Sequence, residues 1–223
     1  MIVGFSGLKR SGKDTAGSYL TDVGFTRMAF ADKLRDVCEA TNPYIKVPWT
    51  MRNARTGLLR PYARLTDVLA KVGWDDAKSQ IPDVRRLLER LATEGVRDVL
   101  GDGLWADAVM RDLDLLLETD STANVVLTDV RFANEAEAIR ARGGVIIQIQ
   151  GRDTPTADEH SSNQGLPAEL VNGYVTNPFD ATFKEEVIAA IDRAFIVLNT
   201  PGAVDTRSRR RRSHLARAAV YMP

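Results

Sequence analysis

Residues 2–15 of the chain read Ile-Val-Gly-Phe-Ser-Gly-Leu-Lys-Arg-Ser-Gly-Lys-Asp-Thr. The first five form a short apolar run, which is typical of a buried parallel strand. A glycine-rich turn follows, and the segment from Lys13 to Leu20 continues as a predicted helix. Gly7, Gly12 and Lys13 fit the pattern G-x-x-x-x-G-K. This order of strand, turn and helix predicts a phosphate-binding loop.

The residue types in this loop suit the phosphates of a nucleotide such as ATP. Gly7 and Gly12 let the backbone wrap the phosphates so that amide N–H groups point inward. The following helix presents its positive end to the same anion, and Lys13 adds a full charge at the β- and γ-phosphates. Lys13 is therefore a candidate catalytic residue. The predicted ATP-binding residues of the loop are Gly7, Lys9, Arg10, Ser11, Gly12, Lys13, Asp14 and Thr15.

Asp14 stands where this pattern usually has Ser or Thr, whose hydroxyl binds Mg²⁺. A carboxylate is an even harder oxygen ligand, so Asp14 is a candidate Mg²⁺ ligand, directly or through water. Alternatively, Asp14 orients or deprotonates the acceptor. Thr15 is expected to donate to the α- or β-phosphate.

The second half of the chain alternates between strands and helices. Strands are predicted at 125–129, 145–149 and 174–176, and helices at 133–142 and 182–198. Such alternation calls for an α/β fold with a parallel sheet covered on both faces.

The first half is less uniform. It predicts a strand at 26–30, a helix at 31–40 capped by Asp32, and helices at 65–72, 84–100 and 104–117. The remainder of 41–83, with several prolines and arginines, has no clear pattern.

Composition narrows the class of protein. Hydrophobic residues make up 44%, which is ordinary for a globular domain, and no apolar run is long enough to cross a membrane. The N-terminus lacks the pattern of a signal peptide, and the single Cys38 cannot form an intrachain disulfide. We therefore expect a cytoplasmic protein with no membrane partner. Cys38 and Trp105 are expected to pack in the interior.

Charge is unevenly distributed although the formal net charge is zero. From Asp205 onward there are six arginines against one acidic residue, with a run at Arg209–Arg212. We expect residues 199–223 to form a basic, mobile tail outside a folded domain at 1–198. The segment Arg207–Arg212 could make weak, nonspecific contact with nucleic acid. This leaves a nucleic-acid-associated NTPase as an alternative function.

Several segments together resemble the bacteriophage deoxynucleoside monophosphate kinases. They are the loop at 6–15, the helix at 84–93, the segment Leu-Thr-Asp-Val-Arg-Phe-Ala-Asn-Glu-Ala-Glu at 127–137, and shorter matches at 158–162, 165–167 and 175–177. The resemblance covers about residues 1–196. A similar loop also occurs in the phosphomevalonate kinases of animals, so the loop by itself leaves the acceptor open. Phosphomevalonate and dephospho-coenzyme A therefore stay alternative acceptors.

The resemblance implies a P-loop kinase fold with a five-stranded parallel sheet. It also implies an acceptor-binding region at 31–122 and a lid at 151–170. The implied reaction transfers the γ-phosphoryl group of ATP, with Mg²⁺, to a deoxynucleoside monophosphate. The resemblance also implies a bacteriophage origin, and the family is one that often dimerises, so a homodimer is a further expectation.

Asp129 and Arg131 lie at the end of a buried strand, on the edge where ligands bind in doubly wound sheets. Asp129 could hold Mg²⁺-bound water or order the acceptor phosphate, or it could cap the helix that begins at Ala133. Arg131 is predicted to be a catalytic phosphate clamp, with a plain surface arginine as the alternative.

Other basic residues are candidates for binding the acceptor. Arg85 and Arg86 open a helix, and because consecutive residues face different directions, only one should reach the acceptor phosphate. Lys33 and Arg35 follow the second predicted strand; a charged helix face is the alternative for both.

In the lid, Arg152 is predicted to be catalytic and to cross the phosphates on closure. His160 beside Glu159 suggests an acid–base pair, but phosphoryl transfer depends on positioning and charge neutralisation more than on a strong base. Asn177 follows the last strand, where the resemblance places a loop over adenine, so Asn177 is a predicted ATP contact.

Overall fold

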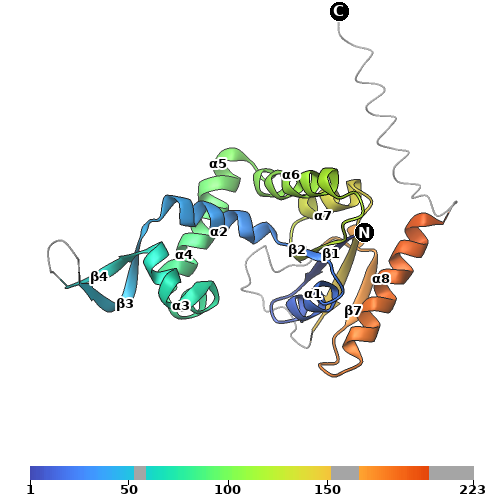
Figure 1. Ribbon diagram of the computed structural model, residues 1–223, viewed down its shortest axis with the longest axis horizontal. Coiled ribbons are helices and arrows are strands. Elements are labelled where there is room, and N and C mark those ends of the chain that lie inside the picture. Colours follow the sequence, from blue (N-terminus) through green and yellow to red (C-terminus); the bar gives the residue numbers. More distant parts are fainter. Residues whose placement is uncertain (53–58, 152–165, 201–223) are drawn as a thin grey trace, which may run out of the picture.

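The computed structural model describes residues 1–52, 59–151 and 166–200, and it has two parts (Figure 1). One is a five-stranded parallel sheet in the order β2-β5-β1-β6-β7. Its strands are β1 (Ile2–Gly7), β2 (Thr26–Met28), β5 (Val125–Val130), β6 (Val145–Gln150) and β7 (Gly173–Thr176). The predicted α/β class and five-stranded parallel sheet are confirmed.

Helices cover both faces of the sheet. One face packs against α1 (Lys13–Thr21) and α8 (Phe183–Asn199), with Phe5 and Phe183 fully enclosed. The opposite face packs against α6 (Leu104–Thr119) and α7 (Ala133–Ala141), with Leu113 and Ile139 inside. None of the described helices is long and apolar enough to span a bilayer.

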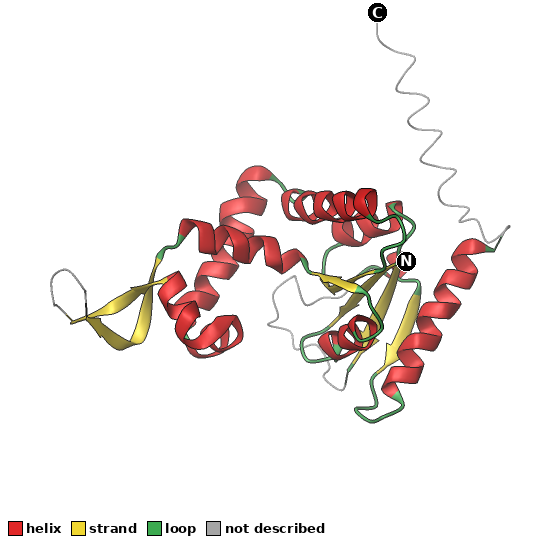
Figure 2. Ribbon diagram, in the orientation of Figure 1, coloured by secondary structure: helices red, strands yellow, loops and turns green. Residues whose placement is uncertain are grey.

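The second part is a lobe beside the sheet, residues 30–52 and 59–100. We call it the acceptor lobe because it overlaps the acceptor-binding region predicted at 31–122, and that role stays a prediction. It consists of α2 (Phe30–Thr41), β3 (Tyr44–Arg52), β4 (Leu59–Arg64), α3 (Leu65–Gln80), α4 (Pro82–Arg90), a π-helix (Leu91–Arg97) and α5 (Asp98–Leu100). Figure 2 shows its antiparallel hairpin well apart from the main sheet. The lobe has an apolar core of its own, which includes Cys38, Leu65 and Val84. Cys38 is fully buried, as expected.

The acceptor lobe differs from the sequence expectation in three places. The hairpin falls in the segment that showed no pattern, where prolines are tolerated because a two-stranded sheet consists only of edge strands. The helix predicted at 65–72 continues to Gln80 after a break at Gly73, which has φ 73° and ψ 173°. The single helix predicted at 84–100 is interrupted by the π-helix, whose Ala92 carbonyl accepts the Nε1–H of buried Trp105 at 3.3 Å.

The predicted cap of α2 was wrong. The helix begins at Phe30 after Ala29, so Asp32 lies inside its first turn, where it pairs with Arg27 and Arg35. The capping carboxylate belongs instead to Asp129 at the far end of β5.

Candidate active site

The turn between β1 and α1 requires glycine at two positions. Gly7 has φ 142° and Gly12 has φ 103°, which L side chains rarely adopt. A Cβ atom would lie 2.2 Å from the Ile149 carbonyl oxygen at Gly7 and 2.3 Å from Asn177 Nδ2 at Gly12. The loop therefore lies directly on β6 and on the segment that follows β7.

Asn177 supports the loop from behind. Its Nδ2 donates to the Ser11 carbonyl at 2.9 Å, and its Oδ1 accepts the N–H of Phe179 at 2.8 Å. The Asn177 side chain is buried, and both its amide nitrogen and its amide oxygen are hydrogen-bonded to backbone groups. The Oγ of Ser11 is buried as well and has no hydrogen-bond partner within the described part of the chain. Direct contact of Asn177 with ATP stays a prediction.

Lys13 is folded onto its own loop. Its Nζ donates to the carbonyl oxygens of Gly7 at 2.7 Å and Leu8 at 2.6 Å. Burial lowers the pKa of Lys13 to about 8; the charge of Arg131 also lowers it, whereas Asp14 and Asp129 raise it. Arg131 and both candidate metal ligands are thus near the loop lysine. Bound phosphate would replace the two carbonyl oxygens as the partner of Nζ.

Asp14 and Thr15 are exposed on the first turn of α1, next to Lys13. The described residues include no cluster of three or more His, Cys, Asp or Glu side chains that could bind a metal by themselves. A nucleotide-bound Mg²⁺ needs only one or two carboxylates besides phosphate oxygens and water. An exposed carboxylate at position 14 fits that requirement.

A cavity of about 510 Å³ lies beside the loop. An edge-to-face pair of Tyr19 and Phe183, with ring centroids 5.9 Å apart, forms part of its wall. Its other lining residues include Arg10, Thr15, Asn177, Phe179 and Asp180. The aromatic residues of this cavity were missed from the sequence, because they come from α1, α8 and the loop between β7 and α8.

Five basic residues from separate elements form what we call the cation group. They are Lys9 in the loop, Arg35 on α2, Lys78 on α3, Arg85 on α4 and Arg131 after β5. Partial burial lowers the pKa of Lys78, and the charges of Arg131, Arg35, Arg85 and Lys9 lower it further. Because like charges repel, this concentration of cations is suited to an anion.

Two members of the cation group have informative surroundings. Arg35 lies with its guanidinium 5.5 Å from the centre of the Trp74 ring and 3.7 Å from Asp32. Lys78 forms no ion pair with any acidic residue in the described ranges, and neither does Arg85. Lys78 was missed from the sequence because it lies beyond Gly73, where the predicted helix had already ended.

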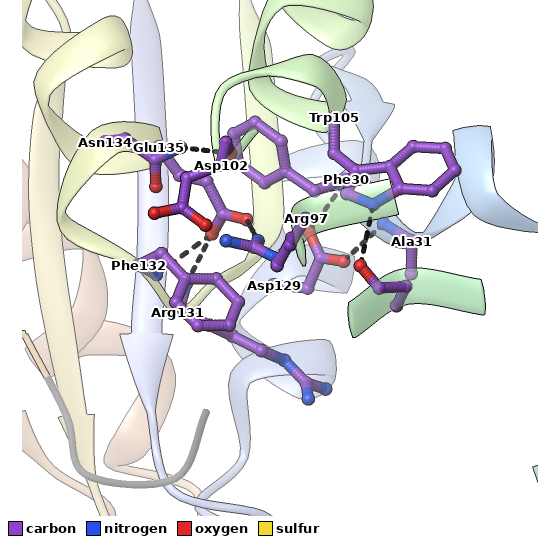
Figure 3. A network of polar contacts seen from close by, with 11 residues as sticks. Phe30, Ala31, Arg97, Asp102, Trp105, Asp129, Arg131, Phe132, Asn134 and Glu135 are labelled. Carbon is purple, nitrogen blue, oxygen red and sulfur yellow. Dashed lines mark hydrogen bonds and ion pairs between the residues drawn. The ribbon is translucent and has the colours of Figure 1, made fainter. Parts of the chain in front are cut away.

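Arg131 projects from the loop between β5 and α7, whose polar contacts are drawn in Figure 3. Asp129 Oδ1 accepts the N–H of Phe30 at 2.8 Å, and its Oδ2 accepts that of Ala31 at 2.9 Å. Burial raises the pKa of Asp129, and these two donors oppose the rise. Asp129 is thus a helix cap, but of α2 rather than of the helix at Ala133; its contact with Mg²⁺ stays a prediction.

The remaining candidates lie elsewhere. Lys33 pairs with Asp112 on α6 and lies 3.8 Å from Asp36. Arg86 pairs with Asp83 and lines a different pocket, between α4 and the start of β3. Between the two neighbours on α4, only Arg85 joins the cation group. Arg152, Glu159, His160 and the Arg207–Arg212 segment lie outside the described residues.

A family model and three known proteins that resemble this chain all point to the same protein family. Residues 63–185 match the model of the family described as deoxynucleotide monophosphate kinase. A protein of Acanthamoeba polyphaga mimivirus, provisionally named deoxynucleotide monophosphate kinase, is 28% identical over 213 residues, which cover 87% of this chain and 97% of the viral protein. The deoxynucleotide monophosphate kinase of Escherichia phage RB69 is 28% identical over 119 residues, 53% of this chain.

The deoxynucleoside-5′-monophosphate kinase of Escherichia phage T5 is 27% identical over 104 residues, 43% of this chain. The matched segments span only 46% and 40% of the RB69 and T5 proteins. The family match contains Lys78, Arg85, Asp129 and Arg131, which belong to the cation group or act on Lys13 through their charge. The chain belongs to the deoxynucleotide monophosphate kinase family.

Proposed function

We propose that this chain transfers the γ-phosphoryl group of ATP to the 5′-phosphate of a deoxynucleoside monophosphate, giving a deoxynucleoside diphosphate and ADP. The observation that supports this best is the cation group opposite Lys13. A kinase whose acceptor is itself a phosphate needs two anion sites in one cleft. We assign one to the loop and the other to the cation group, because the charge of Arg131 acts on both Lys13 and Lys78.

ATP binds with its phosphates in the loop from Gly7 to Thr15 and its nucleoside in the cavity beside Tyr19 and Phe183. Backbone N–H groups at the start of α1 and the ammonium of Lys13 neutralise the β- and γ-phosphates. Mg²⁺ on the nucleotide would be held by Asp14 and would offset charge on the transferring group. Asp129, whose two oxygens already accept N–H groups, would act through water.

The acceptor phosphate binds among Arg131, Arg85, Arg35 and Lys78. One of its oxygens attacks the γ-phosphorus in line, and the bond from that phosphorus to the β–γ bridging oxygen breaks. The second pKa of a phosphate monoester is about 6, so the attacking oxygen is already ionised near neutral pH and needs no general base. The charge of Arg131 acts on Lys13, so we expect Arg131 to help to stabilise the transferring phosphoryl group.

The test is to incubate the protein with ATP, Mg²⁺ and each common deoxynucleoside monophosphate, together with 5-hydroxymethyl-dCMP, and to quantify the diphosphates. Lys13→Ala should abolish the product. Arg85→Ala should raise the KM for the acceptor by about tenfold or more, since a charge-assisted contact is lost. Arg86→Ala is the matched control on the same helix and should leave that KM unchanged.

Failure of the wild-type protein to phosphorylate any of these acceptors while it still binds ATP would overturn the assignment. Phosphomevalonate and dephospho-coenzyme A would then be the acceptors to assay.

A further inference from the structure

The sheet and the acceptor lobe are joined by two chain connections. The first runs from β2 into α2, at Met28 to Phe30, and the second runs from the π-helix and α5 into α6, at Arg97 to Leu104. Residues 129–135, which span the end of β5 and the first turn of α7, make side-chain contacts with both connections (Figure 3). We call this segment the Arg131 loop.

At the first connection, the carboxylate of Asp129 accepts the first two N–H groups of α2. These donors have no partner within their own helix, because the first turn of a helix lacks preceding carbonyls. The Arg131 loop therefore fixes the point where the chain enters the lobe, and with it the base of the helix that bears Arg35.

At the second connection, Glu135 and Arg97 form an ion pair with Oε1 and Nη2 3.3 Å apart. Both side chains are largely buried: that of Glu135 is 3% exposed and that of Arg97 is 11% exposed. In contrast, the Arg90–Glu94 ion pair of the lobe is exposed to solvent. The Arg97 guanidinium also stacks 3.6 Å from the centre of the Phe132 ring. Nearby, Asn134 Nδ2 donates to the Asp102 carbonyl at 2.8 Å.

The same Glu135 carboxylate holds the backbone of the Arg131 loop. Its Oε2 accepts the N–H of Arg131 at 2.8 Å and that of Phe132 at 3.1 Å. One oxygen of Glu135 thus fixes the backbone from which Arg131 projects, and the other binds the last residue of the π-helix. Figure 3 shows the Arg131 side chain leading away from this network, so that its guanidinium is free of the contacts that hold its backbone.

We propose that Glu135 and Arg97 are positioning residues for the acceptor phosphate: they set the place of Arg131 and tie it to the end of the acceptor lobe. This inference rests on the proposed function, in which Arg131 binds that phosphate. Arg85 lies on the helix that continues into the π-helix, so a shift at Arg97 would also move Arg85 relative to Arg131. The buried ion pair of Glu135 and Arg97 therefore keeps Arg85 and Arg131 in a fixed position relative to each other.

Glu135→Gln and Arg97→Lys test the inference with little change in volume. In Glu135→Gln, the carboxylate charge is lost and an amide N–H₂ group takes the place of one acceptor oxygen. In Arg97→Lys, the positive charge remains, but the planar guanidinium with its several N–H donors and its stacking on Phe132 is lost. Asp114→Asn is the matched control. It removes the more exposed two-point ion pair between Asp114 on α6 and Arg142 just after α7, with N–O distances of 2.6 and 2.7 Å.

Both test variants should raise the KM for the deoxynucleoside monophosphate by about tenfold to a hundredfold, the range for a buried charged contact. The KM for ATP should stay unchanged, because the loop at Gly7–Thr15 has no part in the network. Asp114→Asn should change neither constant. The inference fails if the test variants alter both KM values equally, or alter neither while wild type remains active.

An independent measurement uses the ligand-free protein. Amide hydrogen exchange of Arg131 and Phe132 should accelerate in Glu135→Gln and stay as in wild type in Asp114→Asn. Unchanged exchange in Glu135→Gln would overturn the inference whatever the activity shows. Because this readout needs no turnover, an inactive wild-type protein would count against the proposed function alone. Should Glu135→Gln fail to fold, the conservative Arg97→Lys variant provides the same kinetic comparison, and an unchanged KM for the acceptor in Arg97→Lys would then overturn the inference.

Discussion

Replacing Asp129 tests whether its carboxylate is structural, chemical or both. In Asp129→Ala, the N–H groups of Phe30 and Ala31 lose acceptors at 2.8 and 2.9 Å, and Phe30 is only 5% exposed. Losing a helix cap costs about 1–2 kcal/mol, and leaving a buried donor unpaired costs about 1–3 kcal/mol. We therefore expect Asp129→Ala to lower the free energy of unfolding by about 2–4 kcal/mol.

Asp129→Asn should fall between wild type and Asp129→Ala. It keeps one carbonyl oxygen as an acceptor but turns an amide N–H₂ group toward the second donor, so the expected loss is about 1–2 kcal/mol. Asp14→Asn is the matched control, because Asp14 is exposed on the first turn of α1. The Asp14 variant should unfold within about 1 kcal/mol of wild type, the range for a surface charge at a helix N-terminus, yet lose phosphoryl transfer.

The assay is urea unfolding followed by circular dichroism, with kinase activity measured on the same samples at saturating Mg²⁺. A loss of stability in Asp129→Ala, with activity largely recovered at low temperature where the variant is folded, would mark Asp129 as mainly a cap. An unfolding free energy within about 0.5 kcal/mol of wild type, together with lost activity, would refute the capping argument.

Three further outcomes follow from other contacts. Lys78→Gln should raise the KM for the acceptor by about tenfold. It should also slightly raise the free energy of unfolding, because it removes a charge whose pKa is lowered by burial and by repulsion from its neighbours. Equal or lower stability would contradict this. Gly12→Ala should weaken ATP binding measured by calorimetry. The new Cβ would lie 2.3 Å from Asn177 Nδ2, and the backbone at φ 103° would add about 1–3 kcal/mol of strain. Unchanged affinity for ATP would refute the tight packing at Gly12. Cys38 is fully buried, and desolvation raises the pKa of its thiol to about 11. A thiol reagent at about pH 8 should therefore label Cys38 only in urea. Rapid labelling of the native protein would contradict the packing of the lobe.

Features that depend on neighbouring residues along the chain could be predicted from the sequence. The phosphate-binding loop was recognisable because Gly7, Gly12 and Lys13 lie within seven residues between a strand and a helix. The parallel sheet was predictable for the same reason, since each βα unit has its own apolar pattern. Within this frame Arg131 and Arg85 were singled out as candidates, and the fold brings both into the cation group; their binding roles stay predictions.

Features that depend on contacts across the chain could not be predicted. Asp129 caps a helix almost a hundred residues earlier, so its neighbours in sequence suggested a different helix. Lys78 joins the cation group only because α3 resumes after Gly73. No role was assigned to Glu135 or Arg97 from the sequence, and only the fold places the two side chains against each other. Each of these partners is a matter of topology rather than of local propensity.

The separate apolar core of the acceptor lobe has a consequence for how this enzyme can diversify. Its buried residues, such as Leu65 and Val84, pack among themselves rather than against the sheet. Substitutions that reshape the lobe for a different base would therefore be absorbed inside the lobe, and the packing beneath the ATP site would stay as it is. Under the proposed function, acceptor choice and donor chemistry would thus be separable traits, open to change one at a time during descent from a common ancestor.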